Sequence, residues 1–286
     1  MSILVTGATG KIGEYLVKAL SKKGVAVTAF VRDVEKAKKL LGDVNFATGD
    51  LTDTFSFADA IKGKERLFLL TNDQKEEPRL VKIAKEAGVK HVVKISCIGA
   101  SVGAEPGTVI YGHGVAETEL LKFGVPVTFI RPHDFMQNLL AQAASIKGQG
   151  MFFHSTPGTP ISSVHAHDIA AVAASVLTDS IDYHANITYT VTGPDAFTRD
   201  ELAEKLSTIL NKPIKAIAVS DADLFNSSLQ RKVPRGFAHM MVTLGQFYRL
   251  YFGAGNRWIT GNVELVTGTK PLSFEQFIEE NKAAFL

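Results

Sequence analysis

Three glycines near the beginning of the chain have a spacing that can bind phosphate. They lie in residues 6–13, which read Thr-Gly-Ala-Thr-Gly-Lys-Ile-Gly. Gly7 permits a tight turn, Gly10 lets backbone N–H groups approach a pyrophosphate, and Gly13 lets a helix pack closely on the strand before it. This motif binds dinucleotides where a strand precedes it and a helix follows, as the flanking residues predict here; a structural turn is the alternative. The residues expected to hold the diphosphate are Gly7, Thr9, Gly10, Lys11, Ile12 and Gly13.

The residue after the second apolar run distinguishes between two dinucleotides. An acidic residue at this point binds the adenosine ribose and selects NAD, whereas an arginine accommodates the 2′-phosphate of NADP. Here residues 25–31 are followed by Arg32. Its guanidinium can bind phosphate oxygens in a bidentate manner, so we predict NADP(H) as the preferred cofactor and NAD(H) as the second option. The competing interpretation is a surface arginine paired with Asp33 or Glu35.

Two further turns follow the third and fourth apolar runs. Asp50 and Leu51 come after residues 44–48, where the carboxylate can accept a hydrogen bond from adenine and the leucine can pack on its ring. An acidic turn residue is the alternative interpretation of Asp50. Leu70, Thr71 and Asn72 close the fourth run, at the carboxyl edge where open α/β sheets bind their ligands.

Histidine and cysteine residues elsewhere in the chain raise other options. His165, His167 and Asp168 imitate a metal site, but two ligands without a third at helical spacing make a poor zinc site. We therefore expect no metal, and we expect His167 or Asp168 to cap a helix that starts at Ile169. Cys97 follows the fifth apolar run, and a buried small hydrophobic residue is favoured over a redox-sensitive thiol.

These candidate residues lie in a chain that alternates short apolar runs with helical patterns. The runs are rich in β-branched residues, which is typical of strands buried on both faces. Strand–helix repeats with short loops form right-handed parallel βαβ units, so we predict an α/β fold with a Rossmann-type doubly wound parallel sheet. The predicted strands are residues 3–5, 25–31, 44–48, 67–70, 92–96 and 127–130.

The pattern changes after about residue 138, and we predict two parts. Residues 1–150 form an NAD(P)-binding Rossmann domain, and residues 151–286 form a smaller α+β substrate lobe packed on it, within a single unit overall. In the second part, short strands are predicted at 151–153 and 161–164. Helices are predicted at 169–177, 199–210 and 274–285.

Composition narrows the class of protein. The 286 residues carry a formal charge of +2 and are 45% hydrophobic, so nothing indicates a nucleic-acid partner. No apolar run is long enough to span a membrane, and residues 3–5 already read as a strand rather than as part of a signal peptide. A single cysteine excludes an internal disulfide and fits a reducing compartment. We therefore expect a cytoplasmic protein. The sequence leaves open whether it forms a homodimer.

Several longer segments resemble a known family. Besides residues 6–13, they are 87–93 leading to Ser96, 113–117, 131–138, 164–171 and 192–194. Together they resemble the NmrA-like family of atypical short-chain dehydrogenases/reductases. That family includes quinone and triphenylmethane-dye reductases, plant isoflavone- and ether-reductase relatives, and redox-sensing regulators with little catalysis. The stretch 131–138, at its distance from His113, is the most specific of these features.

The resemblance implies where the nicotinamide binds. The residues it places around this ring are Thr71, Asn72, Ser96, Cys97, Ile98, Pro132 and Phe135. The plant reductases carry a lysine where this chain has His113, so His113 is expected to hold the nicotinamide ribose or to donate a proton. Pairing with Glu117 one turn later is the alternative. The Tyr-x-x-x-Lys pair of the wider superfamily is absent, and Tyr111 is a second, weaker candidate for the acid.

The missing pair directs the prediction of the substrate. It favours acceptors that can take a proton from water, such as quinones, azo compounds and dyes, which are planar and apolar. Phe135, Met136, Phe152 and Phe153 would suit them as a pocket, although packing in the core explains such residues equally well. We predict an NADPH-dependent oxidoreductase acting on such a small molecule. The alternatives are a non-catalytic NADP(H) redox sensor acting through a protein partner, and an iminium or benzylic-ether reductase.

Overall fold

The chain folds into two compact units, each assembled from separate segments. A computed structural model describes residues 1–253 and 255–286. The sheet unit comprises Met1–Pro132, Ala166–Val191 and Asn262–Thr269, and the second unit comprises His133–His165, Thr192–Gly261 and Lys270–Leu286. Both units draw segments from either side of residue 150, so they differ from the single division that we predicted along the sequence.

The sheet unit is built on seven parallel strands in the order β3-β2-β1-β4-β5-β6-β8. The order reverses between β1 and β4, which confirms the predicted Rossmann-type doubly wound sheet. Its strands are β1 (Ser2–Val5), β2 (Ala26–Val31), β3 (Asn45–Thr48), β4 (Arg66–Leu69), β5 (His91–Ile95), β6 (Val127–Pro132) and β8 (Thr188–Val191). Its helices are α1 (Lys11–Lys22), α2 (Val34–Leu41), α3 (Thr54–Ile61), α4 (Glu77–Glu86), α5 (Val109–Leu121), α7 (Ala166–Thr178), the 3-10 turn η2 (Ile181–Tyr183) and α11 (Asn262–Thr267).

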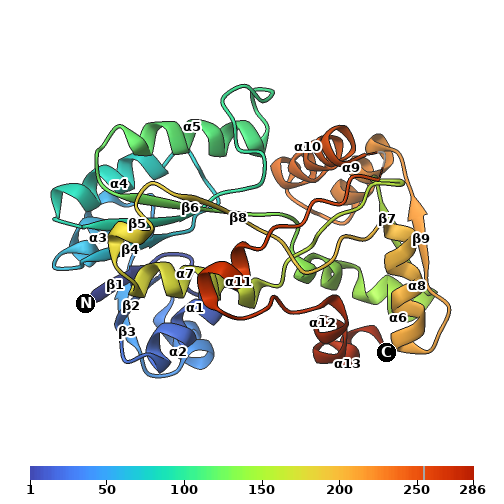
Figure 1. Cartoon of the computed structure of the whole chain (residues 1–286), viewed down its shortest axis with the longest axis horizontal. Helices are drawn as coiled ribbons and strands as arrows, with labels where there is room; N and C mark the ends of the chain where they lie inside the picture. The colour runs from blue at the N-terminus through green and yellow to red at the C-terminus, as the bar shows by residue number, and fades with distance from the viewer. Residues whose placement is uncertain (254) are drawn as a thin grey trace. The chain divides into compact units, whose positions relative to one another are not determined.

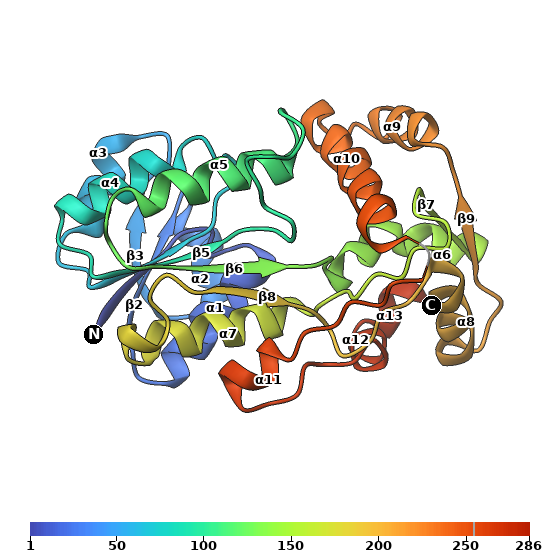
Figure 2. The same ribbon diagram turned by 45° about the horizontal axis from the view of Figure 1, so that its top comes forward.

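Helices cover both faces of this sheet. On one face, α3, α4 and α5 enclose an apolar core with Leu67, Leu69 and Val92 of the strands (Figure 1 and Figure 2). Phe68 is fully buried between Leu67 and Leu69 and points to the opposite face, because successive side chains alternate along a strand. On that face α1 packs against α7, which also contacts β4, β5 and β6. Burial on both sides explains why these strands read as continuous apolar runs.

The second unit has a small core of its own. Strands β7 (Met151–His154) and β9 (Lys215–Ala218) form a parallel pair. Phe152, Leu206 and Phe277 are among the buried residues that fill the core. The helices of this unit are the 3-10 helix η1 (Met136–Gln142), α6 (Ala143–Gln149), α8 (Arg199–Leu210), α9 (Asp221–Gln230), α10 (Arg235–Phe252), α12 (Phe274–Glu280) and α13 (Lys282–Phe285).

Some predicted elements differ from the structure. Residues 161–164 are not a strand, because Ile161 bridges to Phe197 while Val164 bridges to Phe135, so the segment has no single partner. The helix predicted at 274–285 is broken at Asn281 into α12 and α13. Strands β8 and β9 were not predicted.

Helix α7 begins at Ala166, three residues earlier than predicted. His167 and Asp168 therefore lie inside its first turn rather than at its cap, and His167 Nδ1 is 3.1 Å from Asp168 Oδ1. Across residues 1–253 and 255–286, no group of three or more His, Cys, Asp or Glu side chains is arranged to hold a metal ion.

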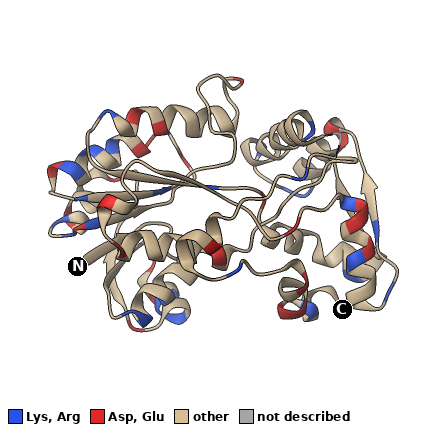
Figure 3. Ribbon diagram, viewed as in Figure 1, with Lys and Arg blue, Asp and Glu red and all other residues tan. Residues whose placement is uncertain are grey.

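Charged residues are distributed over both units. Figure 3 shows basic and acidic residues interspersed along helices such as α4 and α8. Many form local pairs, such as Lys62 with Asp59 and Lys122 with Glu119, three residues apart on their helices. In the part of the chain that the structure describes, no helix is both long and apolar enough to cross a membrane.

Candidate active site

The glycine turn follows β1 directly, and its backbone is packed against itself. Gly7 has φ +63°, which favours glycine, and its carbonyl accepts a hydrogen bond of 2.9 Å from Gly10 N–H. A Cβ added at Gly13 would lie 2.2 Å from Gly7 O and 2.7 Å from Ala8 Cα. A side chain at Gly13 is therefore excluded, so that α1 can start immediately above the turn.

Helix α1 begins without a side-chain cap. Its N-cap is Gly10, whereas α2, α3 and α5 in the same unit are capped by Asp33, Asp53 and Thr108. A helix N-terminus carries partial positive charge on its N–H groups, and an anion can take the place of a cap. Thr9, Gly10 and Lys11 are exposed at this point, so the turn offers a phosphate-binding position.

The end of β4 is bonded to the beginning of this turn. Thr6 Oγ1 accepts a hydrogen bond of 2.9 Å from Leu70 N–H, and it lies 3.2 Å from the carbonyl oxygen of Phe68. Beyond it, Thr71 Oγ1 accepts from Asp73 N–H at 2.7 Å. The predicted residues Leu70 and Thr71 therefore lie beside the glycine turn at the point where strand order reverses, and Asn72 next to them is exposed.

Arg32 follows β2 and is exposed. The two acidic residues that might have paired with it have other partners: Asp33 caps α2 and lies 3.5 Å from Lys36 Nζ, and Glu35 lies 3.7 Å from Lys38 Nζ. The charge of Arg32 instead helps to lower the pKa of Asp50, after hydrogen bonds from Thr52. Its charge therefore acts on the turn that follows β3.

The turn after β3 is firmly held. Asp50 Oδ1 accepts hydrogen bonds from Thr52 N–H at 2.9 Å and from its hydroxyl at 2.8 Å. The carbonyl of Leu51 accepts from Arg79 Nη2 at 2.6 Å. A Cβ at Gly49 would lie 2.6 Å from Phe30 Cζ. Asp50 thus serves as a turn residue, as one of the two interpretations proposed, and its contact with adenine remains a prediction.

The ends of β5 and β6 are joined by backbone hydrogen bonds that bring Ser96, Cys97 and Pro132 together. Ser96 N–H donates to Ile130 O at 2.7 Å, and Ile98 N–H donates to Pro132 O at 3.0 Å. The hydroxyl of Ser96 is buried and has no hydrogen-bond partner among the described residues. An unsatisfied buried hydroxyl is rare in a folded protein and indicates a place for a ligand atom.

Burial raises the pKa of the Cys97 thiol to about 12. The thiol therefore stays protonated near neutral pH, and the thiolate is the reactive form. This agrees with the interpretation of Cys97 as a small hydrophobic residue.

His113 lies in the second turn of α5 and is buried. Its Nδ1 is 2.8 Å from Lys94 Nζ, and its Nε2 is 3.4 Å from the side-chain nitrogen of Gln74. Burial, and then the charges of Lys94 and Arg131, lower the pKa of His113 to about 2. The imidazole is therefore neutral, so only a neutral N–H can donate from it.

Glu117, the other partner considered for His113, binds Arg131 of β6 instead. Arg131 Nε donates to Glu117 Oε1 at 3.0 Å, and its Nη2 contacts the second carboxylate oxygen. The hydrogen bond that Arg131 donates to this carboxylate raises the pKa of Arg131. Tyr111 is half-buried in the first turn of α5, where its backbone N–H donates to Thr108 Oγ1.

Two buried charges beside His113 were missed from the sequence. Lys94 of β5 and Glu77 at the start of α4 are both 0% exposed, with Nζ 3.2 Å from Oε2. Neither Glu77 oxygen accepts a well-directed hydrogen bond from the described residues. Burial raises the pKa of Glu77 to about 7, against the opposing effect of Lys94. In the sequence, the feature that could have indicated this pair is a lysine inside the buried strand segment His-Val-Val-Lys-Ile.

The aromatic residues predicted to line a substrate pocket belong to the second unit. Met136 and Phe152 are each 2% exposed and are part of its core. Phe135 and Phe153 are half-buried. Core packing accounts for Met136 and Phe152, and a substrate contact by any of the four remains a prediction.

Helix α10 contributes a second aromatic group to this unit. His133 stacks on Tyr248, with ring centroids 4.9 Å apart, and Phe252 stacks on Trp258 at 5.7 Å. The backbone N–H of Asp134 donates to His133 Nδ1 at 2.9 Å. Burial lowers the pKa of His133 to about 4, so its ring is neutral at physiological pH.

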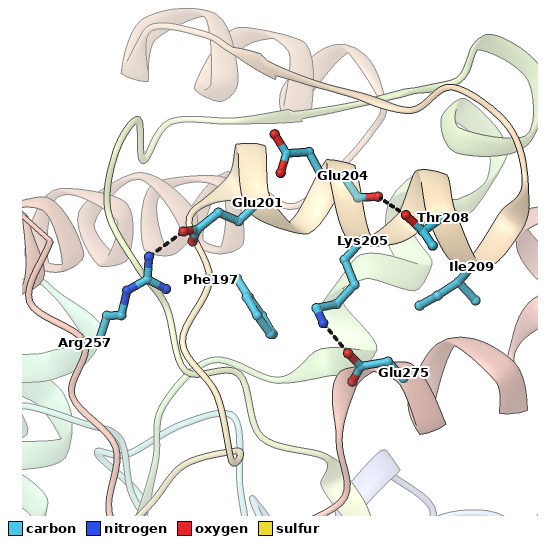
Figure 4. A pocket seen from close by; sticks show the side chains of 8 residues that line it. All are labelled: Phe197, Glu201, Glu204, Lys205, Thr208, Ile209, Arg257 and Glu275. Atoms are coloured by element: carbon cyan, nitrogen blue, oxygen red, sulfur yellow. Dashed lines mark hydrogen bonds and ion pairs between the residues drawn. The ribbon is translucent and has the colours of Figure 1, made fainter.

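A hollow of about 500 Å³ lies along α8 in the second unit (Figure 4). Four of the five charged residues that line it are paired within the unit, Glu201 with Arg257 and Lys205 with Glu275. Lys205 also lies over the ring of Phe197 at 4.7 Å. These pairs link α8 to residue 257 and to α12. The hollow therefore has the chemistry of a solvated ion-pair surface rather than of an apolar pocket for a planar ligand.

The residues of the sheet unit fit an adenine dinucleotide. The glycine turn excludes side chains where a diphosphate needs close approach to the backbone, and α1 has no side-chain cap. Among the described residues Arg32 forms no ion pair, although its charge acts on the carboxylate of Asp50. The buried Ser96 hydroxyl, which has no hydrogen-bond partner in the same part of the chain, can bond to a ligand atom at the carboxyl edge. All of these features follow the carboxyl ends of strands, on either side of the point between β1 and β4 where the strand order reverses.

Comparison with known proteins agrees with this arrangement. NAD(P)H azoreductase of Xenophilus azovorans is 33% identical over 288 residues, covering 99% of this chain and 99% of the relative. An NADPH-dependent quinone oxidoreductase from Escherichia coli has a TM-score of 0.85 at 25% identity, over 98% of this chain and 99% of its own. Citrobacter sp. triphenylmethane reductase in complex with NADP(H) has a TM-score of 0.83 at 25% identity, with 98% and 99% covered. Residues 1–278 match the NmrA-like family, and the chain belongs to that family.

Proposed function

We propose that this protein is an NADPH-dependent oxidoreductase that reduces a small conjugated acceptor such as a quinone, an azo compound or a cationic dye. The observation that carries the proposal is the glycine turn at the strand-order reversal of the sheet unit, with an uncapped helix above it. Relatives with these activities support it, among them the azoreductase at 33% identity.

Each part of the site has a role in holding the cofactor. We assign the diphosphate to the turn formed by Gly7–Gly13 and the 2′-phosphate to Arg32, whose neighbours Asp33 and Glu35 pair with lysines instead. Asp50 and Leu51 are assigned to adenine. Thr71, Ser96 and Pro132 are assigned to the nicotinamide, because they follow three neighbouring strands at one edge of the sheet.

The chemistry follows from these assignments. Bound NADPH supplies the hydride, and the chain has to orient the ring and exclude water. His113 is neutral, so it can donate a hydrogen bond but cannot act as an imidazolium acid near pH 7. We therefore infer that the proton completing the reduction comes from water, which suits quinone, azo and dye acceptors better than isolated carbonyl groups.

The test measures oxidation of NADPH by the purified protein with a quinone, an azo dye, a triphenylmethane dye and a simple ketone. We expect turnover with at least one conjugated acceptor and little with the ketone. In a parallel titration, Arg32→Ala should lower the affinity for NADPH by about tenfold to hundredfold and leave the affinity for NADH unchanged. Lys39→Ala, which alters an exposed lysine of α2, is the matched control.

Two results would contradict the proposal. Tight cofactor binding that depends on its oxidation state, without turnover of any acceptor, would assign the protein to redox sensing. Equal losses of NADPH and NADH affinity in Arg32→Ala would show that the 2′-phosphate is recognised elsewhere.

A further inference from the structure

An ion pair in the interior of the sheet unit lies behind His113. Lys94 points to the face of the sheet covered by α4 and α5, where Glu77 begins α4, and both side chains are fully buried. Burying two opposite charges usually contributes no more stability than apolar residues of the same size would. Stability therefore does not explain this pair, and its contacts indicate what else it does.

The Lys94 ammonium group has three N–H bonds and three neighbouring acceptors. It lies 3.1 Å from Ile95 O, 3.2 Å from Glu77 Oε2 and 2.8 Å from His113 Nδ1. An ammonium group can only donate, so His113 Nδ1 must be the ring nitrogen without hydrogen. The hydrogen of the neutral imidazole then resides on Nε2, because the bond made by one ring nitrogen sets the state of the other.

The second polar neighbour of the ring, Gln74, does not determine which nitrogen of His113 carries the hydrogen. Gln74 lies 3.4 Å from Nε2, in the loop between β4 and α4. An amide can turn either its oxygen or its nitrogen toward a neighbour, so Gln74 adapts to the state of the imidazole. Arg131, the other cation that acts on His113, also disfavours a charged ring.

We propose that Lys94 is a positioning residue, whose ammonium group, held between Glu77 and His113, keeps His113 in the Nε2–H form as a permanent hydrogen-bond donor. This donor lies in α5, after β5 at the carboxyl edge of the sheet. The use of the donor, on the nicotinamide ribose or on the acceptor, rests on the proposed function. The state of the ring is a property of the protein by itself.

The experiment determines which nitrogen of His113 carries hydrogen, by long-range ¹H–¹⁵N correlation spectroscopy of the protein without nucleotide. His113→Gln assigns the signal among the eight histidines. The informative variant is Glu77→Gln combined with Lys94→Met, which removes the ammonium group without leaving a buried carboxylate unpaired. Glu77→Gln alone keeps the lysine, whose nitrogen retains N–H bonds that can donate to His113 Nδ1, while the buried carboxylate is removed. Lys64→Met, which removes a hydrogen bond of 2.8 Å to Thr28, is the matched control.

We expect hydrogen on Nε2 in the wild type, in Glu77→Gln and in Lys64→Met. In the double variant we expect a mixture of both forms. There, kcat with the best acceptor or the affinity for NADPH should fall in proportion to the lost Nε2–H population, by about twofold for an equal mixture. The parameter that falls tells which group receives the hydrogen bond. Hydrogen on Nδ1 in the wild type, or an unchanged Nε2–H form in the double variant, would overturn the proposal.

This measurement also separates the two proposals. If the double variant loses the Nε2–H form while the wild type neither binds NADPH nor reduces any acceptor, the positioning by Lys94 stands and the proposed function fails. If NADPH is bound and oxidised but the hydrogen stays on the same nitrogen of His113 without Lys94, the proposed function stands and this inference fails. A double variant that does not fold is replaced by Glu77→Met with Lys94→Met, which puts two apolar side chains in the same space.

Discussion

The two units differ in whether they bury an ion pair. In the sheet unit, Lys94 and Glu77 are charged groups with no exposure, and the hydroxyl of Ser96 lacks a partner among the described residues. In the second unit, the main ion pairs, such as Arg249 with Asp221, are half-exposed, and the buried ring of His133 is stacked and hydrogen-bonded. The second unit also buries a hydroxyl without a partner among the described residues, that of Thr156. The difference between the units therefore lies in the fully buried ion pair of the sheet unit, which is costly unless something uses it.

Single glycines can be compared between the units in the same way. Gly13 cannot become alanine without moving the turn, whereas a Cβ added at Gly148 of the second unit would have no atom within 4 Å. Gly193 of the second unit is as crowded as Gly13, since its Cβ would lie 2.2 Å from Ser163 O, so crowding alone does not mark a ligand site. The three predictions below test this comparison from the largest effect to the smallest.

Acid should destabilise both units through buried neutral histidines. Burial lowers the pKa of His91 in the sheet unit and of His133 in the second unit to about 4. The unfolded chain takes up these protons near the ordinary pKa of 6.5, so the stabilisation is present above that pH and is lost as pH falls toward 4. Each histidine accounts for about 3 kcal/mol of this loss. Urea unfolding across this range measures it.

The matched variants keep the hydrogen bond of each ring without its titration. His91→Gln can replace the Nε2 contact with Thr128, and His133→Asn can accept the backbone N–H of Asp134. Each variant should show a flatter dependence of the unfolding free energy on pH. If His91→Gln keeps the wild-type dependence of the unfolding free energy on pH while His133→Asn does not, then His91 is protonated in the folded sheet unit as readily as in the unfolded chain.

Gly13→Ala should abolish the fit of the turn to a diphosphate. The new Cβ would lie 2.2 Å from Gly7 O, so the turn must open. We expect NADPH affinity to fall by about a hundredfold and the free energy of unfolding by about 2 kcal/mol. Gly148→Ala in α6 is the control and should stabilise the protein by up to about 1 kcal/mol with NADPH binding unchanged. Normal binding by Gly13→Ala in calorimetry would refute the assignment of the turn.

Two serines give the smallest but sharpest comparison. Ser96→Ala removes an unpartnered hydroxyl, so stability should change by less than about 0.5 kcal/mol while NADPH affinity falls about tenfold. Ser162→Ala in the second unit removes a hydrogen bond of 2.8 Å to Trp258 O. It should cost about 1 kcal/mol and leave NADPH binding unchanged. The reverse pattern would show that the Ser96 hydroxyl serves the protein rather than a ligand.

Local sequence patterns were sufficient to predict most strands of the sheet unit. Six of its strands were predicted within one or two residues at each end, because burial on both faces makes them continuous apolar runs. Strand β8 was missed: its four residues alternate in burial and pair only with β6 at the edge of the sheet. Residues 161–164 failed for the opposite reason, since an apolar pattern there makes single bridges to two different segments.

For the site, the sequence by itself determined the elements whose chemistry is local: the glycine turn, the arginine after β2 and the residues that end each strand. The tertiary structure decided which charges meet. Glu77 and Lys94 are 17 residues apart and His113 is 19 residues further along, yet helix packing on a parallel sheet places all three in contact. A sequence pattern records which residues can be buried, whereas the electrostatic state of a buried residue depends on neighbours that only the fold supplies.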